Sequence, residues 1–374
     1  MNAKTIFAAC FSALAALLLT GACAKLETGG RVNSGDIAME FRAYAPKPKS
    51  AATRVDTGSF VSGTALPDSC TFGVFAFYQP GTVGSGVPAT WSASRTPGFM
   101  FNQKVEHYND AYSYAPERYW PANEENTISF WAYYPYSIYN TGNTGALKLY
   151  SNAACTAAYT KSSTGLPYAK YNVPADPAHQ YDLLFDSFTN KNKTYWNCTP
   201  TPGTVPLNFR HALSWVEFEI IEGTGAVINS MSVTDLYWSG VCTDVENRTW
   251  TAQGDMDDFS VNNVTVNSAI ICSMIMMPQT IESTATLTVN YDITFESSDP
   301  GHPEPITYAG NSGSVLLRSA TQQDGTTPAG ITEWLPGHHY IYKIRAGFER
   351  IEFEEVVDST DDWSVGNNNI SVPE

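Results

Sequence analysis

The sequence of 374 residues predicts an all-β protein, with two tandem antiparallel β-sandwich domains behind an N-terminal leader. Tyr and Phe, which favour strands, occur 21 and 18 times, and Val, Ile and Thr are also abundant. No long stretch repeats its apolar residues with the period of a helix. Short apolar runs are instead separated by turns rich in Gly, Pro, Asn and Ser, and the chain is long for one domain.

Residues 1–22 have the features of a secretory signal that precedes a lipidated cysteine. Lys4 supplies the positive charge, and residues 6–19 form an apolar run too short to span a bilayer. Cleavage before Cys23 would free its thiol for diacylglycerol and palmitate, and several acyl chains together hold a protein on a membrane. The alternative is an ordinary secreted protein in which Cys23 is incidental.

Residues 23–54 are predicted to form a lipidated pro-segment that contains one removable strand. Apolar side chains occupy alternate positions over residues 37–44, which is the period of a half-buried strand, and prolines follow. Residues 47–54 carry three basic side chains and no apolar period, as expected for a loop open to proteases. We therefore expect a strand joined to the body by a loop that can be cut.

Residues 55–203 are predicted to form the first sandwich. A near-continuous apolar run at 70–78 predicts a central strand with both faces covered. Residues 119–121 and 127–135 flank a short polar turn and predict a hairpin. The segment 199–203, Thr-Pro-Thr-Pro-Gly, has the composition of a linker, and we place the domain boundary there.

Residues 204–374 are predicted to form the second sandwich, from roughly seven strands at the spacing typical of two-sheet domains. The predicted strands lie at 205–221, 230–238, 263–266, 270–277, 284–295, 314–317 and 340–348.

The polar tail, residues 351–374, carries Trp363 and Ile370 as single apolar anchors. Such a segment cannot form a core of its own. It can add an edge strand to its own sheet or to a neighbour's sheet through main-chain hydrogen bonds. We predict that Trp363 and Ile370 are the anchors of a donated strand.

The net charge of −16 argues against nucleic acid as a partner, because an acidic surface repels phosphate backbones. Once the signal is lost and Cys23 is lipidated, an odd number of cysteines remains, so at least one thiol stays free or pairs outside the chain. No two of them have the C-x-x-C spacing of a zinc site. These cysteines, whose pairing stays open, are Cys70, Cys155, Cys198, Cys242 and Cys272.

Residue spacing predicts neither an enzyme nor a cofactor site. The six histidines are scattered, and no nucleophile is accompanied by a base and an orienting partner. The acidic residues at 255–258 offer oxygen ligands for calcium, but the full ligand spacing is missing and a solvated turn is favoured. The aromatic clusters at 133–136 and 237–238 offer faces for sugar rings, although core packing is favoured.

Several short segments together resemble one known family. They are Gly-Val-Phe-Ala at 73–76, Tyr-Trp-Pro at 119–121 with the run 128–135, Asp-Leu-Leu at 182–184, the run 207–214, Met-Pro-Gln-Thr at 277–280 and the run 334–342. Their order, together with the leader, is similar to that of fimbrillin-like lipoproteins, the type V pilins. The resemblance covers most of residues 54–374.

The resemblance implies transthyretin-like sandwiches, export as a lipoprotein to the outer membrane, and assembly into an adhesive cell-surface fimbrium. It also implies that an arginine-specific protease removes the first strand, and that the terminal strand of an identical or related pilin subunit fills the groove. Arg54 is the position that best matches the family's processing arginine, and a cut there would release the strand at 37–44. Arg42 lies inside that strand, and a cut at Arg31 would leave it in place.

Two functions of different class remain open at this point. The first is a structural pilin subunit, whether of shaft, tip or anchor. The second is a non-polymerising outer-surface lipoprotein that binds a glycan, a host protein or another bacterial surface ligand. The N-terminus of the surface protein distinguishes them, because only the first function requires a chain that begins after Arg54.

Overall fold

The computed structural model describes residues 37–45, 53–54, 60–61, 66, 68–139, 145–174, 180–192, 204–221, 226–262, 270–296, 301, 304–322, 329–347 and 351–359. Within these ranges the regular elements are β-strands and two short 3-10 turns, η1 (Tyr136–Ile138) and η3 (Leu317–Ser319). The all-β prediction is therefore confirmed. In this part of the chain no helix has the length and apolar character needed to cross a membrane.

The N-terminal half contains a sheet built around β4 (Thr71–Gln79), the strand expected to be central. β4 pairs antiparallel with β5 (Met100–Tyr108) and β7 (Thr127–Tyr134), and side chains on both of its faces are buried. β7 also pairs with β10 (Leu184–Lys191). Both edges of β7 are therefore occupied, and the predicted hairpin between 119–121 and 127–135 is wrong. The described strands of this sheet follow the order β12 (Arg210–His211), β10, β7, β4, β5 and β6 (Ala111–Ser113).

The predicted strand at 37–44 is present as β1 (Glu40–Tyr44). It pairs in parallel with β11 (Thr204–Asn208), a partner about 160 residues away along the chain. β1 lies over one face of β4 and β7, where the Phe41 ring contacts Phe72 and Phe130.

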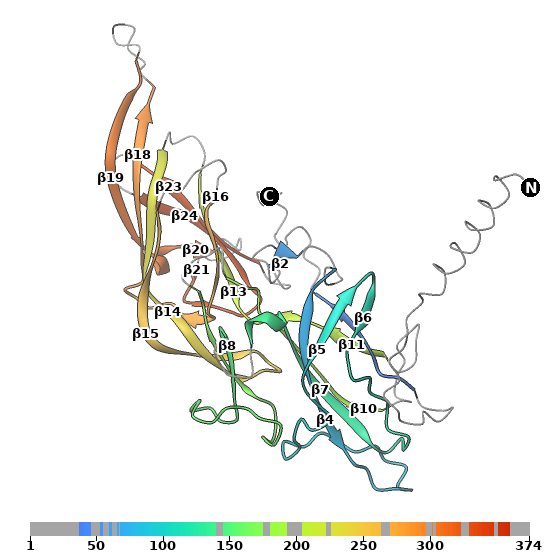
Figure 1. Cartoon of the computed structure of the whole chain (residues 1–374). Helices are drawn as coiled ribbons and strands as arrows, with labels where there is room; N and C mark the ends of the chain where they lie inside the picture. Colours follow the sequence, from blue (N-terminus) through green and yellow to red (C-terminus); the bar gives the residue numbers. More distant parts are fainter. Residues whose placement is uncertain are drawn as a thin grey trace, which may run out of the picture. The chain divides into compact units, whose positions relative to one another are not determined.

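Two further sheets form most of the C-terminal half, and Figure 1 shows β14, β15, β18 and β19 as the long strands of the second of them. The first sheet, as far as it is described, has the order β16 (Ile270–Met276), β13 (Ser214–Ile220), β23 (His339–Ala346), β24 (Ile351–Ser359), β20 (Thr321–Gln322) and β21 (Ala329–Gly330). The second has the order β19 (Ile306–Leu316), β18 (Thr286–Phe295), β14 (Ala226–Asp244), β9 (Tyr168–Asn172) and β8 (Leu147–Tyr150), with β15 (Thr249–Asn262) paired along β14. Two small pairs join β17 (Gln279–Thr280) to β22 (Glu333–Trp334) and β2 (Thr53–Arg54) to β3 (Phe60–Val61).

Most strands predicted in this half are present, in β14, β16, β18, β19 and β23, whereas the segment 263–266 lies outside the described residues. The turn expected at 255–258 is wrong, because these residues lie inside β15 and Asp257 pairs with Leu236 of β14. Cross-strand pairing holds a polar segment that has no apolar period of its own. The start of the polar tail, predicted to add a strand to its own sheet or to a neighbour's, forms β24 beside β23.

Strand pairing crosses the domain boundary predicted at residue 203. β8 and β9 precede the boundary, yet β9 pairs with β14 of the C-terminal half. β12 follows the boundary, yet it pairs with β10 of the N-terminal half. One buried cluster accordingly runs from Phe75 and Trp131 through Tyr171 to Trp215 and Tyr342. The division into two tandem sandwiches therefore stays a prediction, and a separate second unit would have to include β8 and β9.

Candidate functional site

The buried face of β1 follows from its sequence. Met39, Phe41 and Ala43 are at most 2% exposed, whereas Glu40 and Arg42 face solvent. This alternation arises because successive strand residues point to opposite faces. Burial of an apolar side chain as large as Phe or Met stabilises a fold by about 1.5–3 kcal/mol relative to exposure. β1 is therefore part of the core although it lies near the chain terminus.

One edge of β1 forms a main-chain ladder. The parallel register runs from Glu40 opposite Thr204 to Tyr44 opposite Asn208. The Phe209 N–H donates to the Tyr44 carbonyl at 2.8 Å and extends the pairing beyond β11. These hydrogen bonds involve no side chain of β1, so they depend only on an extended backbone in this register.

The other edge of β1 is held mainly by side chains. The Tyr114 hydroxyl donates to the Met39 carbonyl at 2.8 Å, and the Tyr112 hydroxyl donates to the Ala43 carbonyl at 2.9 Å. The Met39 N–H donates to the Arg118 carbonyl at 2.8 Å. Burial raises the pKa of Tyr112 and of Tyr114 to about 12, so both hydroxyls keep their protons at neutral pH. Two phenols thus act where a neighbouring strand would supply backbone donors.

The Phe41 ring occupies an aromatic cage. Its centroid lies 5.3 Å from that of Tyr114, 6.0 Å from Phe130 and 6.3 Å from Phe72, with interplanar angles between 73° and 90°. Edge-to-face pairs of this kind contribute about 0.5–1.5 kcal/mol each beyond area burial. We call the surface under β1 the β1 groove: β11 and residues 112–118 form its walls, and Phe72 and Phe130 form its floor.

The sequence analysis identified the strand but not the groove that receives it. Tyr112 lies in β6 and Tyr114 directly follows it, and the two-residue spacing places both rings on one face. That spacing was the available signal. The pairing with β11 joins segments distant in sequence and leaves no local pattern.

Arg54, the predicted processing residue, lies in β2, and its main chain pairs antiparallel with Phe60 of β3. A short strand pair is therefore found where an open loop was expected. Cys23, Trp363 and Ile370 lie outside the described residues. The lipid anchor, the cut and the donor-strand anchors stay predictions.

The described histidines have structural partners rather than a catalytic arrangement. Three histidine nitrogens lie 2.9 Å from carboxylate oxygens, in the pairs His211 with Asp182, His338 with Asp358, and His339 with Glu217. The His107 ring stacks on Tyr112 at 4.3 Å and so supports one wall of the β1 groove. Among the described residues, no group of three or more His, Cys, Asp or Glu side chains is placed to hold a metal ion.

The aromatic clusters considered as sugar platforms are packed against protein. Tyr133 and Tyr134 are fully buried, and Trp238 stacks on Phe259 with ring centroids 5.5 Å apart. The preference for core packing is confirmed for these side chains.

For two of the cysteines in the described part of the chain, the structure answers the question of disulfide pairing. Cys155 and Cys242 are not disulfide-bonded, and burial raises the pKa of both thiols. The Cys242 thiol donates to the Asp244 carbonyl at 3.3 Å.

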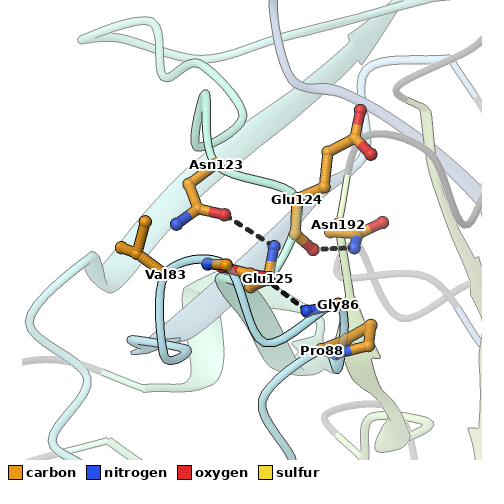
Figure 2. A pocket seen from close by; sticks show the side chains of 8 residues that line it. Val83, Gly86, Pro88, Asn123, Glu124, Glu125 and Asn192 are labelled. Atoms are coloured by element: carbon orange, nitrogen blue, oxygen red, sulfur yellow. Dashed lines mark hydrogen bonds between the residues drawn. The ribbon is translucent and has the colours of Figure 1, made fainter.

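A second concave feature lies under the loop that contains Val83 and Gly86 (Figure 2). The Glu125 carboxylate accepts the Gly84 N–H at 2.8 Å and the Gly86 N–H at 2.7 Å. The Gly86 hydrogen bond is the main cause that lowers the pKa of Glu125. Asn192 donates to the Glu124 carbonyl on the far side, as Figure 2 shows. The Glu125 carboxylate thus accepts the backbone N–H donors that an anionic ligand would need, and these hydrogen bonds anchor the loop.

Comparison with known proteins agrees with the architecture. A family model described as fimbrillin-like matches residues 53–363. Over 88 residues the chain is 33% identical to fimbrium subunit Fim1C of Phocaeicola vulgatus, a match that covers 22% of this chain and 21% of that protein. The chain thus spans about a fifth of the length of this curated relative.

Two solved structures share the fold at low sequence identity. A fimbrial protein from Bacteroides vulgatus has a TM-score of 0.56 at 16% identity, with 87% of this chain and 99% of that one covered. A candidate cell adhesion protein from Bacteroides uniformis has a TM-score of 0.51 at 16% identity, with 88% and 100% covered. The family match confirms the resemblance inferred from the sequence and agrees with the prediction of a non-enzymatic protein. Because the family model covers most of its length, the chain belongs to the fimbrillin-like family.

Proposed function

We propose that this protein is a subunit of an adhesive cell-surface fimbrium and assembles by strand exchange after proteolytic removal of β1. The observation that carries the proposal is the position of β1. It supplies a buried face to the fold, has a strand ladder on one edge only, and precedes Arg54 in the chain. Family membership and the fimbrial relative support the fimbrial part of the proposal.

The proposed pathway has two processing steps. Residues 1–22 direct export, and acylation of Cys23 attaches the pro-segment 23–54 to the outer membrane. An arginine-specific protease then cuts after Arg54 and frees β1 together with the lipid anchor. Arg42 is exposed but lies within β1, where hydrogen bonds on both edges hold the main chain and oppose entry into a protease site.

Strand exchange follows from the free energy of the emptied groove. Loss of β1 uncovers the apolar floor and the main-chain groups of β11. Each large apolar side chain that loses its cover costs about 1.5–3 kcal/mol, and the free edge of β11 presents unpaired N–H and C=O groups to another strand. A strand from a neighbouring subunit satisfies these groups together, so assembly is strong. Because residues 351–359 already form β24, the proposed donor is the following segment, with Trp363 and Ile370 as its anchors.

The proposal is tested by the N-terminus of protein extracted from the cell surface. Processed subunits are expected to begin at Val55 and to form heat-stable, protease-resistant oligomers. The Arg54→Gln variant is expected to remain unprocessed and monomeric, whereas the matched Arg42→Gln control is processed normally. Surface protein that begins at Cys23, or an Arg54→Gln variant that assembles like the wild type, contradicts the proposal.

A monomeric surface lipoprotein that binds a glycan or host protein is the alternative function. The observation in its favour is a set of exposed apolar side chains near one end of the β18–β19 hairpin. Phe295, Ile306 and Tyr308 are 42–51% exposed, and the rings of Phe295 and Tyr308 pack edge to face at 6.0 Å. Exposed apolar groups of this kind often mark contact surfaces. This alternative predicts an intact leader on cells, so the same N-terminal sequence distinguishes the two functions.

A further inference from the structure

The hydrogen bonds around β1 select for backbone geometry and not for side chains. β11 pairs with the main chain on one edge, and the Tyr112 and Tyr114 hydroxyls donate to carbonyls on the other edge. Any extended strand in the same register can accept these bonds. Selection among strands must therefore come from the side chains that enter the groove.

Four alternate positions of this chain define what the groove accepts. Met39, Phe41, Ala43 and Ala45 are 1%, 2%, 1% and 5% exposed. The aromatic cage receives the ring at the second position. The third and fourth positions hold alanine with almost no exposed surface, so a larger or polar side chain there must displace neighbours or lose its hydrogen bonds. The pattern is apolar, aromatic, small, small.

The tail of this chain does not match that pattern. In residues 360–374, every set of four alternate residues includes at least one Asp, Asn, Ser, Thr or Glu. Trp363 and Ile370 are seven residues apart, an odd number, so an uninterrupted strand points them to opposite faces. Only one of the two anchors can enter a given groove. A copy of this tail would therefore bury at least one polar side chain in the β1 groove.

We infer that the β1 groove accepts a strand from a different subunit, with an apolar, an aromatic and two small residues at alternate positions, in preference to the tail of a second copy. This inference rests on the proposed strand exchange. It assigns Tyr112 and Tyr114 as the residues that hold the incoming main chain, and the Phe41 cage as the site that selects its side chain. The tail is then left for the groove of another subunit.

Exchange of labelled peptides into the cut protein tests the inference. The secreted chain, with Cys23→Ala and a site-specific protease sequence inserted after Arg54, is cut while β1 remains bound. Three peptides then compete for the groove: residues 37–45, the same peptide with Phe41→Ala, and residues 360–374. Fluorescence polarisation measures affinity, and native mass spectrometry confirms release of the original fragment. The 37–45 peptide is expected to exchange, and the other two are expected to bind at least about tenfold more weakly.

The outcomes separate the inference from the function beneath it. If the tail peptide binds as tightly as the 37–45 peptide, selection for a different subunit is wrong while strand exchange stands. The same holds if the cut chain polymerises by itself and deletion of residues 360–374 abolishes this. If the 37–45 peptide fails to exchange, the groove does not accept strands and the proposed function fails too.

Discussion

Replacement of Phe41 by alanine in the uncut chain measures how much β1 contributes to the fold. The substitution removes a ring that is 2% exposed and surrounded by Phe72, Tyr114 and Phe130. Phe→Ala changes in cores cost about 3–5 kcal/mol, from lost transfer free energy and the cavity left behind. The edge-to-face contacts place Phe41 within this range. If β1 instead detaches as a whole, the loss is limited to the free energy with which β1 binds its groove.

Urea denaturation followed by tryptophan fluorescence provides the measurement. Trp120 packs edge to face on Phe130, at the floor of the groove, and is one of the nine tryptophans whose emission reports unfolding. Arg42→Ala is the matched control, because Arg42 is in the same strand and exposed, and it is expected to change stability by less than about 0.5 kcal/mol. Equal midpoints for Phe41→Ala and the wild type, or equal losses for both variants, would refute the conclusion that β1 belongs to the core.

Three further predictions use the same assay or spectroscopy. The Tyr112→Phe, Tyr114→Phe double variant should lose about 0.5–1.5 kcal/mol of unfolding free energy for each hydrogen bond removed. Burial raises the pKa of both phenols from 10 to about 12, so the wild type should lose stability as pH rises from 10 to 12, and the variant should lose less over this range. Burial raises the pKa of the Asp186 carboxyl from 3.8 to about 6, so its contribution to stability is full below pH 3.8 and is lost as pH rises through 6. As pH rises from 4 to 7, the unfolding free energy of the wild type should therefore fall relative to that of Asp186→Asn by on the order of 3 kcal/mol. A fragment of residues 204–374 lacks β8 and β9 and should give the circular dichroism spectrum of an unfolded chain. A β-sheet spectrum that is lost in a cooperative transition would instead show that β14 folds without β9.

Local patterns made much of the fold predictable. The alternation at 37–44 identified β1 and its buried face, and the apolar run at 70–78 identified β4 as a strand covered on both sides. In each case the period of the side chains directly records which face is buried. β15 was missed because it is held by main-chain pairing with β14 and has no apolar period of its own.

The candidate site was less predictable because it depends on contacts distant in sequence. The parallel pairing of β1 with β11 and the crossing of β9 to β14 are set by the packing of the whole chain. Tyr112 and Tyr114 act through their hydroxyls on main-chain carbonyls, and such contacts leave no complementary residue in β1 to detect. The two-residue spacing places these tyrosines on one face of an extended segment but does not show what they hold.

The walls of the β1 groove are all downstream of Arg54, and this decides what a cut can change. Tyr112 is supported by the stacked His107 ring at 4.3 Å, and the Asp186 carboxylate accepts the N–H of Asn208 in β11 at 2.8 Å. Neither support involves β1. On the proposed mechanism, cleavage therefore removes the occupant and leaves the surface that recognises the next one. The uncut chain and the assembled subunit then differ in which strand fills the groove, and the pattern required of that strand is fixed before the protease acts.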